Sequence, residues 1–236
     1  MIDKTTASVQ AAVAGIQDGA SVMISGFGEA GSPIELIHAL IDQGAKGLTV
    51  ISNNAGNGHV GLAALIEAGR VRKMICSFPK SSNSTVFTEN YRKGEIELEL
   101  VPQGTLAARI QAGGSGVPAF FTPTGVGTIL AEGKEERAFD GKRAILELAL
   151  TADFALISAN VADTYGNLTY RYSGRNFAPL MCMASRQAIV QARRIVPPGG
   201  IDPEIVITPS IFVQHVVEVP NPASESALIA KGVRYP

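Results

Sequence analysis

The sequence predicts an α/β protein built on a largely parallel, doubly wound sheet flanked by helices. Three observations predict this fold class. Short apolar runs of strand character alternate with runs whose apolar residues recur at helical spacing, most regularly over residues 21–78. The 236 residues include 25 glycines, which suits many tight turns between strands and helices. Hydrophobic residues make up 46% of the chain, which is enough for a large packed core.

The first part of the chain shows this alternation most clearly. Val9, Val13 and Ile16 recur at helical spacing, and Pro33 stands where the first turn of the next helix begins. We expect helices over 5–19, 33–45 and 59–70, and strands over 21–25, 47–52 and 71–78. Such an order is typical of parallel strands joined by crossover helices.

The middle of the chain changes in character. A strand runs into a loop over 96–106, and a helix follows over 106–114. A loop-rich excursion around 112–145 comes next, and Asp140-Gly141 is a turn signal that predicts a hairpin over 134–150. The alternation then resumes, with strands expected over 152–162, 193–196 and 211–219, a turn into a short strand over 163–171, and a helix over 178–191.

We expect one α/β domain over residues 1–219 and a C-terminal tail over 220–236. The tail falls outside the alternating pattern. It is expected to be either a frayed end or an arm that contacts a partner.

Charge and composition exclude several classes of function. The formal net charge is −1 and there is no basic run, so nucleic acid is not an expected partner. No apolar stretch is long enough to span a bilayer and the N-terminus lacks a secretory signal pattern, so we expect a cytoplasmic protein without a membrane partner. Cys76 and Cys182 are far apart and lack zinc-ligand spacing, so we expect buried side chains and no metal site.

Residues 26–31 raise the question of a dinucleotide ligand. Gly26, Gly28 and Gly31 have the spacing G-x-G-x-x-G between an expected strand and an expected helix, as in the dinucleotide-binding fingerprint. That fingerprint also needs an acidic side chain after the next strand, to bind the ribose hydroxyls. The next strand ends instead in Ser-Asn-Asn at 52–54, which weakens the hypothesis of an NAD(P)- or flavin-binding protein.

The loop has the physical features of a ligand site in either case. Glycines let the backbone approach a ligand closely, and amides at a helix N-terminus favour an anion or a developing oxyanion. Phe27 lies between two glycines. Its ring is either exposed on the loop or packed into the core beneath it.

Residues 18–33, DGASVMISGFGEAGSP, resemble the signature of the class I coenzyme A transferases. The signature is Asp-Gly, two residues, three apolar residues, Gly-Gly-Phe, three residues, Gly, one residue and Pro. Ser25 replaces the first glycine of Gly-Gly-Phe, and a serine would be strained if that position needed a positive φ. Residues 52–78, 99–128, 132–147 and 175–184 also resemble the A subunits of this family, so the resemblance runs from about Thr5 to Val219.

The resemblance implies an enzyme that is active only with a second subunit. CoA moves from succinyl-CoA to a 3-oxo acid, with 3-oxoadipate favoured and acetoacetate the alternative, and no cofactor is bound permanently. In this family the nucleophile is a glutamate on the B subunit, which forms covalent intermediates that preserve the thioester energy. Glu29, Glu89 and Glu225 do not match its motif, so the expected partner is a B subunit, in a heterodimer or heterotetramer.

The resemblance also implies roles for single residues. It places Gln103 near the reacting carbonyl, where a side-chain amide can stabilise an oxyanion. It assigns a run of loop residues to coenzyme A, namely Ser25, Gly26, Phe27, Gly28, Glu29, Ala30 and Gly31.

Other residues are candidates for the substrate pocket. Asn53 and Asn54 follow a strand at the edge where open α/β sheets bind ligands, although they could simply form Asx turns. Arginine binds carboxylates through two parallel hydrogen bonds. The candidates to bind a substrate carboxylate are therefore Arg171, Arg175, Lys134 and Arg137, with Arg171 and Arg175 placed in the pocket.

Two rival hypotheses stay open on the sequence alone. The first is the stand-alone dinucleotide-binding protein suggested by the glycine spacing. The second is a non-catalytic relative that holds an acyl-CoA without exchanging its CoA.

Overall fold

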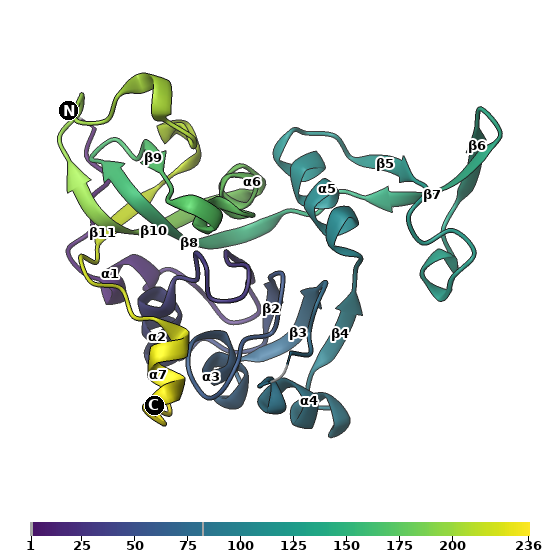
Figure 1. Ribbon diagram of the computed structural model, residues 1–236, viewed down its shortest axis with the longest axis horizontal. Coiled ribbons are helices and arrows are strands. Elements are labelled where there is room, and N and C mark those ends of the chain that lie inside the picture. The colour runs from purple at the N-terminus through teal and green to yellow at the C-terminus, as the bar shows by residue number, and fades with distance from the viewer. Residues whose placement is uncertain (1, 82) are drawn as a thin grey trace.

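The computed structural model describes residues 2–81 and 83–236 and confirms an α/β fold (Figure 1). The main sheet has eight strands in the order β11-β10-β8-β1-β2-β3-β4, with β9 paired to β8. Neighbours along that order are parallel, and β9 is antiparallel to β8. These strands are β1 (Ser21–Ile24), β2 (Leu48–Ile51), β3 (Val71–Cys76), β4 (Glu97–Leu100), β8 (Ala152–Asp163), β9 (Leu168–Thr169), β10 (Ser185–Val196) and β11 (His215–Glu218).

Helices cover both faces of this sheet. One face packs against α1 (Val9–Val13), α2 (Ile34–Gln43), α3 (Gly61–Glu67) and α4 (Thr85–Arg92), and the other against α5 (Gln103–Gly114) and α6 (Ala178–Ala184). The central strand β1 shows the division, because Val22 and Ile24 belong to the first core and Met23 to the second. A sheet buried on both faces needs central strands that are apolar on both sides, and the runs SVMI of β1 and LTVI of β2 are largely of this kind.

The chain winds in opposite directions from the middle of the sheet. From β1 it passes through α2 to β2, and from β8 it passes through α6 to β10. Because β1 and β8 are neighbours and these two helices lie on opposite faces, the carboxyl ends of β1 and β8 flank a topological switch point. Open α/β sheets bind ligands at such a point.

The predicted helix over 178–191 is wrong in its second half. α6 ends at Ala184, and β10 then pairs with β8 from Ser185 opposite Ala152 to Val196 opposite Asp163. Residues 189 and 190 are β-branched and fully buried in this strand, which suits a pleated sheet better than a helix. Pairing with a strand distant in sequence outweighs the local helical spacing.

Three smaller differences have local causes. The first helix is shorter than predicted, because the Ser8 hydroxyl accepts the Ala11 N–H and starts α1 within the expected range. Helix α4 was not predicted, since Val86 and Phe87 are its buried residues and give little periodicity. The strand predicted over 211–219 narrows to β11, and the 3₁₀ turn η4 (Ser210–Phe212) precedes it. Another 3₁₀ turn, η3 (Pro203–Ile205), lies between β10 and η4.

The loop-rich excursion contains a second, three-stranded sheet in the order β5-β7-β6. Its strands are β5 (Ala119–Thr122), β6 (Glu136–Phe139) and β7 (Lys142–Leu148), and the 3₁₀ turn η1 (Ile129–Ala131) precedes β6. The predicted hairpin is confirmed: Asp140 and Gly141 have φ of +49° and +76°, both positive as a type I′ turn requires. Figure 1 shows this sheet standing off the main sheet beyond α5.

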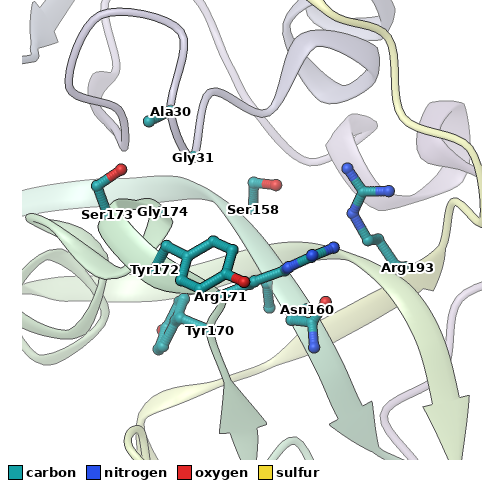
Figure 2. Close-up of a pocket in the computed structure, with 11 residues that line it drawn as sticks. Ala30, Gly31, Ser158, Asn160, Tyr170, Arg171, Tyr172, Ser173, Gly174 and Arg193 are labelled. Carbon is teal, nitrogen blue, oxygen red and sulfur yellow. The ribbon is translucent and has the colours of Figure 1, made fainter.

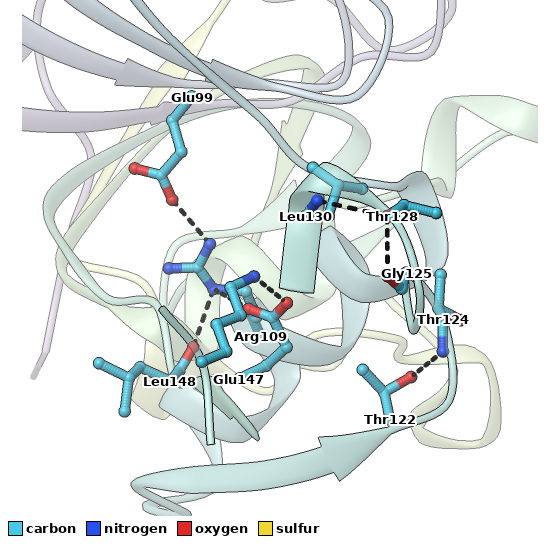
Figure 3. Close-up of polar contacts among 10 residues, drawn as sticks. Glu99, Arg109, Thr122, Thr124, Gly125, Thr128, Leu130, Glu147 and Leu148 are labelled. Carbon is cyan, nitrogen blue, oxygen red and sulfur yellow. Dashed lines mark hydrogen bonds and ion pairs between the residues drawn. The ribbon is translucent and has the colours of Figure 1, made fainter. Parts of the chain in front are cut away.

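Arg109 on α5 links the small sheet to the main one (Figure 3). Its Nε donates to the carbonyl oxygen of Leu148 in β7, and its Nη1 donates to Glu99 Oε1 in β4, both at 2.8 Å. The buried carboxylate of Glu147 lies 4.0 Å from the same Nε. One guanidinium therefore joins a strand of each sheet.

The C-terminal tail folds back onto its own chain and is not frayed. It forms α7 (Glu225–Ala230), which lies near α2 and α3 in Figure 1. Asn57 Nδ2 donates to Glu225 Oε1 at 2.8 Å. The Tyr235 ring stacks on His38 with centroids 3.7 Å apart, and its hydroxyl donates to Asp42 at 2.7 Å.

Replacing Arg109 with alanine is expected to lower the free energy of unfolding by about 2–4 kcal/mol, because buried Glu147 and the Leu148 carbonyl lose a charged neighbour. Urea unfolding followed by circular dichroism measures the change. Arg143→Ala is the control, since its pair with Glu136 is exposed and its loss should leave the midpoint unchanged. Equal effects of the two substitutions would contradict the linking role of Arg109.

Candidate functional site

Side chains from the ends of three neighbouring strands form one polar network. Asn53 follows β2, Ser77 follows β3, and Gln103 opens α5 after β4. Asn53 Oδ1 accepts hydrogen bonds from the Ser77 hydroxyl at 2.7 Å and from Gln103 Nε2 at 2.8 Å. Because the carboxyl ends of parallel strands share one edge of a sheet, the topology brings these distant residues together.

Gln103 keeps a donor available to a ligand. A side-chain amide nitrogen carries two N–H groups, and Asn53 binds one of them. Asn53 is buried, with 4% of its surface exposed, whereas Gln103 is exposed. The buried partner therefore orients the exposed amide, and the second N–H is left for a ligand at the sheet edge.

Asn54 has a different role from its neighbour. Its Oδ1 accepts the backbone N–H of Gly56 at 2.9 Å, which is the Asx turn considered from the sequence. Its Nδ2 donates to the carbonyl oxygen of Gly28 over a long 3.4 Å. Asn54 thus shapes its own loop and brings it against the glycine loop.

A hydrogen bond from Ser25 joins the two ends of the glycine loop. Gly26, Gly28 and Gly31 have φ of +141°, +61° and +78°, values that side chains rarely adopt. The Ser25 hydroxyl donates to the carbonyl oxygen of Gly31 at 2.7 Å. Ser25 does not have a positive φ, so the serine at this position of the signature brings no backbone strain.

A second segment, residues 171–177, holds the loop from outside. Asn176 Nδ2 donates to the carbonyl oxygen of Ala30 at 2.8 Å, and its Oδ1 accepts the N–H of Gly26 at 3.2 Å. A Cβ on Gly31 would lie 2.5 Å from the carbonyl oxygen of Gly174, which is closer than packing permits. Asn176 was missed by the sequence analysis, although it lies in the segment 175–184 that carries part of the resemblance.

The side chains of Phe27 and Glu29 differ in their surroundings: the Phe27 ring is exposed, and the Glu29 carboxylate is hydrogen-bonded to the tail. Phe27 is 50% exposed, so the alternative in which its ring packs into the core is wrong. The Glu29 carboxylate accepts the N–H and hydroxyl of Ser226, at 2.9 and 3.0 Å, and the hydroxyl of Ser224 at 3.1 Å. These bonds, led by the backbone N–H, lower the pKa of Glu29. Glu29 therefore anchors the tail to the loop.

A cavity of about 330 Å³ lies beside this loop at the switch point (Figure 2). Its wall includes Gly31 of the loop, Ser158 and Asn160 of β8, Arg193 of β10, and Arg171, which precedes η2 (Tyr172–Arg175). The sequence analysis placed Arg171 here but missed Arg193. No local signal singles out Arg193, because Arg194 beside it is equally basic and exposed, and only the pairing of β10 with β8 brings Arg193 to the cavity.

The other basic candidates lie elsewhere. Arg175 ends η2 and is outside the described lining of the cavity. Lys134 pairs with Glu147, and Arg137 pairs with Glu135 and lies over the Phe121 ring. Both residues lie with the small sheet and outside the described lining of this cavity, and their binding to a substrate carboxylate stays a prediction.

Both cysteines of the chain are buried. Cys76 and Cys182 are buried free thiols, and burial raises the pKa of each to about 12. Within residues 2–81 and 83–236 no cluster of three or more histidine, cysteine or acidic side chains is placed to hold a metal ion. Over the same residues, every helix is too short or too polar to cross a membrane.

Comparisons with known proteins agree on one family. A family model described as coenzyme A transferase matches residues 6–219. The chain is 59% identical to the A subunit of 3-oxoadipate CoA-transferase from Pseudomonas putida, over 99% of this chain and 100% of that one. It is 46% identical to the A subunit of a probable succinyl-CoA:3-ketoacid coenzyme A transferase from Bacillus subtilis, over 91% and 89%. Glutaconate coenzyme A-transferase from Acidaminococcus fermentans has a similar fold, with a TM-score of 0.82 at 19% identity over 92% of this chain and 76% of that one.

Gly31→Ala is expected to destabilise the fold by about 2–4 kcal/mol, because the added Cβ meets the Gly174 backbone at a positive φ. Thermal unfolding measures the loss. Gly28→Ala is the matched control, since Gly28 also has a positive φ but open space around it, and about 1 kcal/mol is expected there. A smaller effect at Gly31 than at Gly28 would disprove the close approach.

Proposed function

This chain belongs to the coenzyme A transferase family, and we propose that it is the A subunit of an enzyme that moves CoA from succinyl-CoA to a 3-oxo acid. The proposal rests chiefly on the network of Gln103, Asn53 and Ser77. It presents an oriented amide donor at the edge of the sheet where ligands bind. The dinucleotide hypothesis is not retained, because residues 52–54 supply no carboxylate and the family is that of the CoA transferases.

A B subunit supplies the nucleophilic glutamate. The three glutamates considered from the sequence are not presented for attack beside Gln103. Glu29 binds the tail, Glu225 is buried against Asn57, and Glu89 lies on α4. Burial raises the pKa of Glu225 despite its hydrogen bond from Asn57, and the same burial keeps its carboxylate away from a substrate.

The exchange proceeds through two covalent intermediates. The glutamate attacks the thioester carbonyl, and collapse of the tetrahedral oxyanion expels CoA thiolate and leaves a succinyl–glutamyl anhydride. The thiolate then attacks the glutamyl carbonyl, succinate leaves, and the enzyme holds CoA as a glutamyl thioester. The carboxylate of the 3-oxo acid then attacks the glutamyl thioester and displaces CoA thiolate. The thiolate attacks the 3-oxoacyl carbonyl of the new anhydride, which releases 3-oxoacyl-CoA and the free glutamate. The free N–H of Gln103 donates to the oxyanions that form, while Asn53 holds the amide in place.

Residues 25–31 form the part of this subunit that meets coenzyme A. Three positions of the loop have positive φ angles and are occupied by glycine. Because glycine has no side chain, a ligand can come close to the backbone there. The exposed Phe27 ring offers an apolar contact to the CoA chain. Glu29 belongs to this run and also supports the loop, because its carboxylate accepts hydrogen bonds from Ser224 and Ser226 of the tail.

3-Oxoadipate is the favoured acceptor acid. The P. putida relative, which shares 59% identity over its full length, is named for this acid, whereas the B. subtilis relative, at 46%, is named for 3-ketoacids. Acetoacetate is therefore the alternative acceptor. Substrates of this kind are intracellular metabolites, which fits a cytoplasmic location.

A thioester-exchange assay tests the proposed function. Formation of 3-oxoacyl-CoA from succinyl-CoA is followed with 3-oxoadipate or with acetoacetate, using this chain alone and with a B subunit. Activity is expected only with both chains, and the preferred acid identifies the substrate. Activity of this chain alone would place a nucleophile within it, and a complex that binds acyl-CoA without exchange would favour the non-catalytic relative.

Gln103→Ala is expected to lower kcat at least about a hundredfold, because it removes an oxyanion donor. Gln111→Ala on the same helix is the matched control and should retain activity. Gel filtration with the B subunit checks that assembly is intact. Wild-type turnover of an intact Gln103→Ala complex would remove Gln103 from the mechanism.

A further inference from the structure

The cavity at the switch point gathers positive charge that this chain does not neutralise. Arg193 on β10 is in register with Asn160 on β8, so both side chains point to the same face of the sheet. Arg171 reaches the cavity from the turn before η2, and both arginines are among the lining residues drawn in Figure 2. Residues distant in sequence thus bring two guanidinium groups to one wall.

Neither guanidinium has an ion pair or a hydrogen bond to another described side chain. Many other arginines of this chain are paired, including Arg72, Arg109 and Arg234. The described lining of the cavity includes no aspartate or glutamate. Two cations facing a shared space without a counter-charge favour an anionic ligand.

The remaining wall suits a carboxylate. Ser158 and Asn160 line the cavity and can donate hydrogen bonds to an anion. The Arg171 guanidinium lies 5.0 Å from the centre of the Tyr172 ring, and this stacking restricts its motion. Tyr172 holds a φ of +49°, a conformation that is costly for an aromatic residue and that the surrounding turn must maintain.

We propose that Arg171 and Arg193 bind the distal carboxylate of the dicarboxylic acids that this enzyme exchanges. The inference rests on the proposed function and names the substrate class of the same site. Succinate and 3-oxoadipate each carry one carboxylate that reacts and one that does not. The two guanidinium groups come from different segments and can serve both half-reactions, first for the shorter succinyl group and then for the longer incoming acid.

The spacing of the strands fits this assignment. Only β1 separates β8 from β2, so the two strands lie about 10 Å apart across the sheet. The register of Met23 with both Ile51 and Ala155 puts Ser158 of the cavity near the level of Asn53. Asn53, which orients Gln103, follows β2, and the arginine cavity lies beside β8. An extended diacid with a guanidinium at its far end covers such a distance. A monocarboxylic 3-oxo acid leaves the cavity without an anion.

The test uses the complex of this chain with its B subunit. In a ping-pong exchange, kcat/KM for an acid reports only the half-reaction in which that acid takes CoA. Arg193→Gln and Arg171→Gln are each expected to lower kcat/KM for 3-oxoadipate about 10- to 100-fold, because a charge-assisted contact is lost. The loss for acetoacetate should be much smaller. Among the CoA donors, kcat/KM should fall more for succinyl-CoA than for acetoacetyl-CoA.

Arg194→Gln is the matched control. It removes the same charge one residue further along β10, where the side chain points to the opposite face, and should not change the preference between acids. Equal losses for diacids and monoacids, or for both thioesters, would mean that the arginines contact CoA or support the fold, and would overturn the proposal. Unchanged kinetics in the two arginine variants would also overturn the proposal. A wild-type complex that transfers CoA to neither acid would instead refute the proposed function.

Discussion

The site depends on one close approach, that of the glycine loop to the segment after β9. The Gly31 backbone lies so near Gly174 that no side chain fits between them, and Asn176 is hydrogen-bonded to both ends of the loop. These contacts hold the turn after β1 against a segment that joins β8 to β10. From β1 the chain continues to β2, and from β8 it continues to β10 on the other side of the sheet. The contact between Gly31 and Gly174 therefore joins the two halves of the sheet and forms one wall of the cavity at the switch point.

Two functional regions follow from this arrangement. On one side of β1, Asn53 and Gln103 present an amide donor, and on the other side Arg171 and Arg193 face a cavity. The loop lies between them and is supported by the tail through Glu29. Under the proposed function these groups serve a thioester and an acid, while the carboxylates of Glu29 and Glu225 are bonded to other parts of the chain. This division of groups is physically consistent with an active site completed by a second subunit.

Local chemistry made much of this predictable. Glycine spacing located the loop, the end of an apolar strand located Asn53, and the resemblance to the CoA transferases located Gln103. The features that the sequence analysis missed depend on contacts with residues distant in sequence. Residues 185–191 have helical spacing but pair with β8. Arg193 could not be identified as a site residue before the register of β10 with β8 was known.

The central claim is that this chain is a half-enzyme that supports a nucleophile on its partner. Mass spectrometry of both intact chains, after incubation with succinyl-CoA and brief acid quenching, tests it most directly. The account predicts that CoA becomes attached to a glutamate of the B subunit, and only when this chain is present. Attachment of CoA to this chain, or to an isolated B subunit, would contradict it.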